Sequence, residues 1–129
     1  MKEALFIAES ARDAGEIPVG SVVVKDGQII GRGANRQLRD SDPAAHAEII
    51  ALREAGRKLG NWRLDGALMY STVNPCAMCR EAIRRARIEH VYYATPKARE
   101  STHSTEYTAL EGYAGEASEL IRGFFQKRR

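Results

Sequence analysis

The order of apolar and polar positions along the chain predicts an N-terminal helix followed by a β-hairpin. Residues 2–14 place apolar side chains at helical spacing among charges, and Gly15 ends the segment. Residues 19–25 are mainly β-branched and apolar, and residues 28–33 form a second short run. The pair Asp26-Gly27 between these runs is typical of a two-residue turn, so the two runs are expected to pair as neighbouring strands.

The rest of the chain continues the alternation of helices and strands. Residues 35–42 predict a polar loop, and a helix is expected from about Pro43, in its first turn, to Leu59, before Gly60. The later expected elements are a strand at 67–73, a helix from Pro75 or Cys76 to about Ala86, a strand at 88–94, irregular residues at 95–106, a short strand near 107–110 and a helix at 115–125. This order predicts an α/β fold, a three-layer sandwich with one central mixed sheet and helices on both faces.

Length and composition favour one compact domain over residues 1–129. The chain has 129 residues, 43% of them hydrophobic and 29% charged, which is ordinary for a globular protein. No signal-peptide pattern or transmembrane stretch is present, and the two cysteines form no disulfide framework, so we expect a cytoplasmic protein that does not enter a membrane. A net charge of +3 does not by itself indicate a nucleic-acid partner.

Two short motifs carry the chemistry: His46-Ala47-Glu48, and Pro75-Cys76-Ala77-Met78-Cys79 thirty positions later. One imidazole and two thiolates are the ligands of a zinc site whose fourth position stays open, as in catalytic sites. A carboxylate beside such a site can take a proton from water and pass it to a leaving group, which is the role expected of Glu48. His-x-Glu with Pro-Cys-x-x-Cys is the signature of zinc nucleobase deaminases.

Two other interpretations of these motifs, neither of them a deaminase, remain open. Cys76 and Cys79 alone are also compatible with a redox dithiol, which would purify without stoichiometric zinc. A non-catalytic, zinc-stabilised RNA-binding module would use Glu48 only as a helix-capping or surface residue. No second Cys-x-x-Cys or histidine pair is present in the sequence to close a structural zinc site.

The expected helix starts place the ligands at one point. Cys76 and Cys79 are three positions apart, so both project from one face of a helix start. Free N–H groups and the positive end of the helix dipole favour thiolates there. His46 is expected in the opening turn of its own helix. The two helix starts should therefore meet in the crevice at the strand ends, where α/β sheets bind their ligands.

From about Ala14 to Ala94, and again at its C-terminal helix, the chain resembles the cytidine/deoxycytidylate deaminase superfamily. The resemblance is to the branch with bacterial tRNA adenosine deaminases, guanine deaminases and fungal cytosine deaminase. The matching stretches are Ile17-Pro18-Val19-Gly20, Gly33-Ala34-Asn35-Arg36, residues 42–53 around His46-Ala47-Glu48, and residues 75–79.

The resemblance implies a role for each matching position. His46, Cys76 and Cys79 would hold Zn2+, and Glu48 would move the proton. Asn35 would hydrogen-bond the base, although an asparagine at this place is also a common turn residue. The backbone around Ala47 and the strand-end residues Thr72 to Asn74 would line the pocket. The family also implies a homodimer, which an apolar stripe of alanine and isoleucine after Cys79 supports only weakly.

The substrate is expected to be a small-molecule nucleobase or nucleoside. The tRNA enzymes usually carry a glutamate where this chain has Asn74, and an acidic residue where it has Pro96, and the segment at 95–106 is shorter than theirs. The alternative substrate is a tRNA anticodon loop. It is supported by Phe124-Phe125 and the basic residues that end the chain, which resemble the C-terminus of the tRNA enzymes and suit an unpaired RNA loop.

Overall fold

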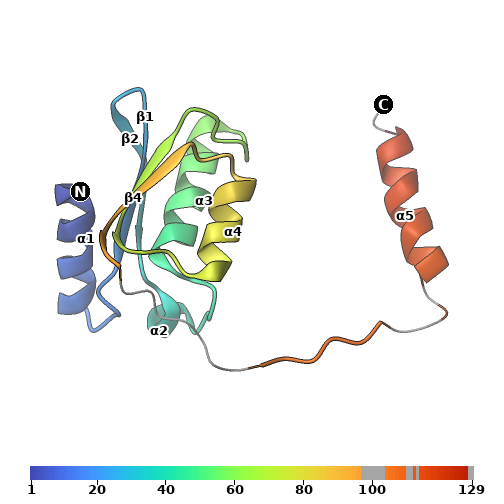
Figure 1. Cartoon of the computed structure of the whole chain (residues 1–129), viewed down its shortest axis with the longest axis horizontal. Coiled ribbons are helices and arrows are strands. Elements are labelled where there is room, and N and C mark those ends of the chain that lie inside the picture. The colour runs from blue at the N-terminus through green and yellow to red at the C-terminus, as the bar shows by residue number, and fades with distance from the viewer. Residues whose placement is uncertain (97–103, 110–111, 113, 128–129) are drawn as a thin grey trace.

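The computed structural model describes residues 1–96, 104–109, 112 and 114–127. Its elements in chain order are α1 (Lys2–Asp13), β1 (Gly20–Lys25), β2 (Gln28–Ala34), α2 (Gln37–Asp40), α3 (Ala47–Leu59), β3 (Leu68–Val73), α4 (Ala77–Arg85), β4 (His90–Thr95) and α5 (Ala114–Lys127). These elements confirm the expected α/β sandwich with one mixed sheet, and Figure 1 shows its layers.

The sheet has four strands in the order β2-β1-β3-β4. β1 pairs antiparallel with both β2 and β3, whereas β3 and β4 run parallel. The predicted two-residue turn joins β1 to β2, with Asp26 at φ 51° and Gly27 at φ 75°, as a type I′ turn requires. Because β3 and β4 are parallel, their C-terminal ends reach the same edge of the sheet, and α4 starts just beyond that edge.

Helices cover both faces of the sheet, as predicted. α1 lies on one face, while α3 and α4 lie on the other (Figure 1). The main core fills the space between the sheet and the α3–α4 layer, and it consists of Val23, Ile30, Ala51, Ala55, Leu64, Ala67, Met69, Cys79 and Ile83. A metal-ligand candidate, Cys79, therefore belongs to the hydrophobic core as well as to the site.

Two glycines of β2 allow α3 to approach the sheet very closely. A Cβ atom on Gly33 would lie 2.0 Å from the Ala47 carbonyl oxygen, and one on Gly31 would lie 2.3 Å from the Ala51 carbonyl oxygen. A glycine inside a strand often marks the close approach of another backbone, and here the backbone of α3 occupies the space of both missing side chains. This contact sets the position of the first turn of α3.

Helix α3 begins four residues later than expected. Asp42 accepts a hydrogen bond from the Ala44 N–H through its side chain (2.9 Å), and its carbonyl accepts one from the Ala45 N–H (3.2 Å). These tight turns replace the first turn of a helix, so Pro43 precedes α3 and His46, with φ −74° and ψ 152°, is its N-cap.

Three other local expectations also change. The loop at 35–42 contains the short helix α2. Helix α4 begins at Ala77 with Cys76 as its N-cap, so Pro75 lies before the helix and not in its first turn. The described residues 107–109 form no strand, and Leu110 lies outside the described residues.

Helix α5 stands apart from the sandwich, on the side of α3 and α4 (Figure 1). Leu120, Ile121 and Phe125 are exposed on it. Among the helices that the structure describes, none is both long and apolar enough to cross a membrane.

We expect Gly33→Ala to destabilise the fold, because its methyl group would overlap the Ala47 carbonyl. Forcing extra volume into a packed core costs about 1–3 kcal/mol. Gly115→Ala is the matched control, since a Cβ atom there meets nothing within 4 Å. Urea denaturation of both variants measures the difference. Equal stability of the two would contradict the close contact between β2 and α3.

Candidate metal centre and active site

His46, Cys76 and Cys79 come together although thirty residues separate the first from the other two. The Nδ1 atom of His46 lies 3.4 Å from Sγ of Cys79 and 3.6 Å from Sγ of Cys76. One ligand atom from each residue lies within 4.8 Å of the others, so all three can reach one metal ion. One imidazole nitrogen and two sulfurs fit zinc with a fourth position left for water or substrate.

Two helix starts bring these ligands together. His46 is the N-cap of α3 and Cys76 is the N-cap of α4, both with extended backbone, and Cys79 follows in the first turn of α4. Arg80 holds the entry to α4 in place, because its Nε donates to the Pro75 carbonyl oxygen at 2.9 Å. The helix starts and their hydrogen bonds thus fix the backbone that carries the three ligands.

Glu48 lies in the first turn of α3 with only 2% of its surface exposed. Burial raises the pKa of its carboxyl above the usual value, although its own backbone N–H, the neighbouring His46 and a side-chain hydrogen bond with Cys79 oppose the shift. A buried carboxyl beside a metal-ligand cluster is well suited to accept and return protons near neutral pH.

The thiol of Cys79 ionises less readily than the sequence-based expectation of a thiolate at a helix start. Burial raises the pKa of the Cys79 thiol, and the nearby charges of Glu48 and Cys76 raise it further. These effects outweigh the helix N-terminus, which was expected to favour the thiolate. A divalent cation reverses the balance, because a coordinating thiol loses its proton. The donor set therefore fits zinc, and the charge of the ion compensates three groups that repel one another when ionised.

Asn35 lies at the end of β2, buried, with its side chain engaged in a turn. Its Nδ2 donates to Oε1 of Gln37 at 2.9 Å, and its Oδ1 accepts from the Gln37 backbone N–H at 3.0 Å. The turn interpretation of Asn35 is therefore correct for the present contacts. Its role toward a base stays a prediction.

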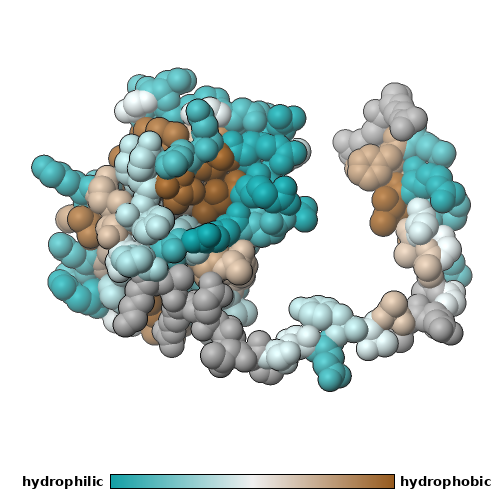
Figure 2. Space-filling view, in the orientation of Figure 1, coloured by the Kyte–Doolittle hydropathy of each residue, from teal (hydrophilic) through white to brown (hydrophobic). Residues whose placement is uncertain are grey.

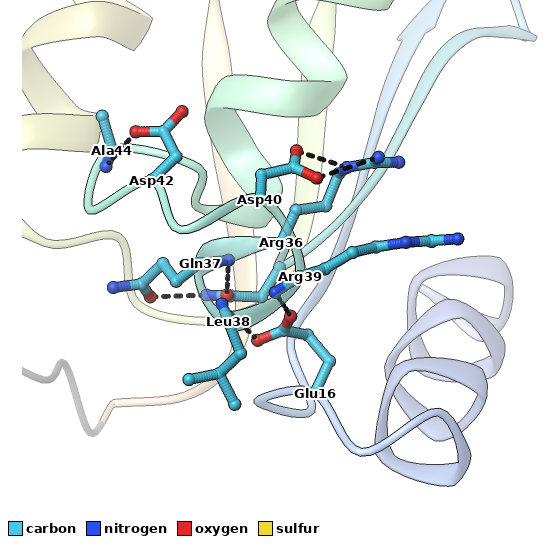
Figure 3. Close-up of polar contacts among 9 residues, drawn as sticks. Glu16, Arg36, Gln37, Leu38, Arg39, Asp40, Asp42 and Ala44 are labelled. Atoms are coloured by element: carbon cyan, nitrogen blue, oxygen red, sulfur yellow. Dashed lines mark hydrogen bonds and ion pairs between the residues drawn. The ribbon is translucent and has the colours of Figure 1, made fainter.

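A carboxylate that the sequence reading did not single out holds the loop after Asn35. Figure 3 shows Glu16 pointing from the chain after α1 toward α2, where it accepts hydrogen bonds from the N–H groups of Leu38 (3.3 Å) and Arg39 (3.0 Å). Partial burial favours the neutral acid, but hydrogen bonds from Arg39, Ile17 and Leu38 outweigh it and hold the pKa of Glu16 below its usual value. An acidic residue next to a helix start in the sequence is a recognised capping signal. Glu16 lies 22 residues before Leu38, so no such local signal exists in the sequence for this contact.

The remaining predicted pocket residues lie near the strand ends with partners of their own. Ala47 is fully buried under Gly33. The hydroxyl of Thr72 accepts the Gly20 N–H at 3.1 Å, which ties β3 to β1. Oδ1 of Asn74 accepts from the Arg80 guanidinium at 2.5 Å, on the α4 side. Their contact with a substrate stays a prediction.

Residues 1–95 match the model of the cytidine and deoxycytidylate deaminase zinc-binding region, and the chain belongs to this family. It is a zinc-dependent hydrolytic deaminase, in agreement with the His-Cys-Cys group of the structure. The predicted superfamily, its zinc cofactor and its enzyme class are confirmed.

Two relatives match the whole chain. A tRNA-specific adenosine deaminase of Haemophilus influenzae is 38% identical over 100% of this chain and 83% of its own length. A tRNA-specific adenosine deaminase of Agrobacterium fabrum is 40% identical over 100% of this chain and 93% of its own length.

Solved structures of two kinds are similar. One comes from work on A-to-I editing by tRNA:A34 deaminases at the wobble position of transfer RNA. It is 46% identical, with a TM-score of 0.72 over 74% of this chain and 73% of the other. The other is a guanine deaminase from Bacillus subtilis, 32% identical, with a TM-score of 0.80 over 94% of this chain and 90% of the other.

We expect Cys79→Ala to lose the zinc ion, because two protein ligands hold zinc much more weakly than three. The purified protein should carry one zinc ion per chain, and metal analysis by mass spectrometry measures it. Met78→Ala is the control, since Met78 neighbours Cys79 on α4 and is partly exposed. Full zinc content in Cys79→Ala would remove Cys79 from the ligand set.

Proposed function

We propose that this deaminase converts adenosine to inosine in a tRNA anticodon loop, in the cytoplasm. Two bacterial tRNA-specific adenosine deaminases match the whole chain, including its C-terminal segment, and this match supports the assignment of the substrate. The alternative stated from the sequence is thus better supported than a free nucleobase or nucleoside.

The proposed chemistry assigns one task to each residue. His46, Cys76 and Cys79 hold zinc, which supplies the Lewis acidity that makes water a nucleophile near neutral pH. Glu48 accepts the proton of the attacking water. It gives this proton to the adenine ring nitrogen, then takes the remaining proton of the added hydroxyl and gives it to the amine, so that a C=O bond replaces the C–N bond and ammonia leaves.

The pocket assignments from the resemblance form part of the same proposal. Asn35 binds the base after exchanging a hydrogen bond with Gln37 for one with the substrate. The backbone at Ala47 and the residues Thr72 and Asn74 border the pocket. Glu16 acts on this pocket through the loop that it holds (Figure 3).

A guanine-type free base is the second candidate substrate. The observation in its favour is that the guanine deaminase structure covers 94% of the chain at a TM-score of 0.80, against 74% and 0.72 for the tRNA:A34 deaminase structure. The same chemistry serves both rings, because each presents an amine beside a ring nitrogen.

We also propose that the chain forms a homodimer through the α3–α4 surface. A groove of about 760 Å³ lies between the two helices, and its lining includes apolar side chains (Ile49, Leu52, Ala82 and Ala86) and three arginines. Trp62 borders it and is 66% exposed. Figure 2 shows an apolar patch on the sandwich, ringed by hydrophilic side chains, and such a patch is typical of an interaction site.

Light scattering at micromolar concentration should give twice the 14.3 kDa mass of one chain. Leu52→Asp should shift the protein toward monomer, because it buries a charge in the groove. Phe6→Asp should not, since Phe6 is an exposed apolar residue of α1, on the other face of the sheet. A monomeric wild-type protein would refute the dimer.

Glu48→Gln should keep zinc and the fold but lose turnover by at least about 10²–10⁴-fold, the usual contribution of one general acid–base group. The loss should fall on kcat, since the amide cannot move a proton. Glu54→Gln removes a charge from the same helix and serves as the control. Activity within a few-fold of wild type in Glu48→Gln would reject Glu48 as the proton carrier.

An anticodon stem-loop with adenosine at the wobble position should be converted to inosine faster than free adenosine, cytosine or guanine at equal concentration. Turnover of the stem-loop should also fall with added salt, because phosphate contacts release counterions, whereas turnover of an uncharged base should not. Ammonia release and nucleoside analysis measure both. Turnover of guanine with none of the stem-loop would establish the second candidate instead.

A further inference from the structure

Backbone contacts hold the chain after β2 beside the candidate metal centre. Gly33, near the end of β2, lies against the carbonyl of Ala47. The N–H of Arg36 donates to the carbonyl oxygen of Ala45 at 2.8 Å. Asn35 lies between these two contacts, which reach the residues directly before and directly after the first metal-ligand candidate. The backbone therefore places Asn35 next to the start of α3.

Gln37 hydrogen-bonds both polar atoms of the Asn35 side chain. Oδ1 of Asn35 accepts from the backbone N–H of Gln37 at 3.0 Å, and Nδ2 donates to Oε1 of the Gln37 side chain at 2.9 Å. A backbone N–H can only donate, so the oxygen of the Asn35 amide must face it, and this fixes the orientation of the amide. Asn35 thus offers a donor at the position where Oε1 of Gln37 lies.

The backbone of Gln37 is held on both sides. Its carbonyl oxygen accepts from the N–H of Asp42 at 3.1 Å. Glu16 accepts from the next two N–H groups, those of Leu38 at 3.3 Å and Arg39 at 3.0 Å (Figure 3). The bond to the amide oxygen is therefore made by fixed backbone, whereas the bond to the amide nitrogen is made by a side chain that can rotate.

The Gln37 side chain covers an amide that is otherwise out of reach. Asn35 is only 5% exposed, so a base can contact its amide only after a covering group has moved. Gln37 is partly exposed, and its carboxamide can turn into water. A buried N–H without an acceptor is costly, so Nδ2 needs Oε1 of Gln37 before a substrate binds and an acceptor of the base afterwards.

We propose that the Gln37 side chain occupies the place on Asn35 that a hydrogen-bond acceptor of the base takes, and that substrate binding displaces it. This inference rests on the proposed role of Asn35, and it adds Gln37 as a positioning residue with two effects. Gln37 weakens substrate binding, because its bond to Nδ2 must break first. It also selects the base, since only an unprotonated ring nitrogen or a carbonyl oxygen can replace Oε1.

The first test is the kinetics of Gln37→Met, which removes the acceptor and keeps the backbone N–H. The KM should fall by about two- to tenfold, the range of one net hydrogen bond, with kcat within about twofold, because the lost bond belongs to the free enzyme and not to the complex. Leu38→Met is the control, since it places the same side chain at a neighbouring position that is 64% exposed, and it should change neither constant. An unchanged or raised KM in Gln37→Met would overturn the proposal.

The substrate in this test is whichever of the anticodon stem-loop and guanine the protein deaminates, so a wrong choice between them does not affect the result. Asn35→Ala by itself should raise the KM, because the base loses a donor. If it does not, the proposed contact of Asn35 with the base is wrong, and the displacement of Gln37 is wrong with it.

A double-mutant cycle shows whether Gln37 acts through Asn35. Adding Gln37→Met to Asn35→Ala should leave the KM unchanged, because the donor for which the two acceptors compete is gone. The same fall in KM with and without Asn35 would overturn the proposal, even if Asn35 does contact the base.

Urea denaturation tests the same pair without any substrate. Gln37→Met should lower the free energy of unfolding when Asn35 is present, since Nδ2 is then buried without its acceptor. In the Asn35→Ala background the same substitution should cost less. An equal loss of stability in both backgrounds would show that the side chain of Gln37 does not act on Asn35, and would overturn the proposal.

Discussion

The start of α3 is held against β2 by a contact that only glycine permits, and the site depends on it. With no Cβ on Gly33, the backbone of Ala47 lies directly on the strand. His46 immediately precedes this point and Glu48 immediately follows it, so their positions are set by a backbone contact and not by flexible side-chain packing. Cys76 and Cys79 reach the same point from α4, whose entry Arg80 ties to Pro75. The three metal-ligand candidates and Glu48 thus share one rigid support.

The electrostatics of the site also explain its dependence on a metal ion. Glu48, Cys76 and Cys79 are potential anions near one another, and Cys79 is in the hydrophobic core. Burial raises the pKa of Glu48 and that of Cys79, and the charges of Glu48 and Cys76 raise that of Cys79 further. Zinc supplies the opposing charge, so metal binding, ionisation of the thiols and a carboxyl ready to exchange protons form one coupled equilibrium.

The loop after β2 links the site to a more distant part of the chain. Asn35 is held by Gln37, and the helix that follows is held by Glu16 from the end of the α1 segment. The ion pair of Arg36 with Asp40 (2.8 Å) lies on the exposed side of the same loop and contributes little by itself. These hydrogen bonds anchor the backbone of the loop that follows Asn35.

The sequence by itself determined the fold class, the hairpin with its Asp26-Gly27 turn, and the zinc-binding group of a deaminase. These depend on local signals: alternating patterns, a turn pair, and ligand types at fixed spacing. Tertiary structure decided where α3 and α4 begin, because the turn at Asp42 and the contact at Gly33 set the helix starts where local preference favoured Pro43. It also decided that Cys79 resists ionisation, since burial and neighbouring charges exceed the influence of the helix terminus. The hydrogen bonds of Thr72 with Gly20 and of Glu16 with Leu38 and Arg39 join residues far apart in the chain, which short-range patterns do not encode.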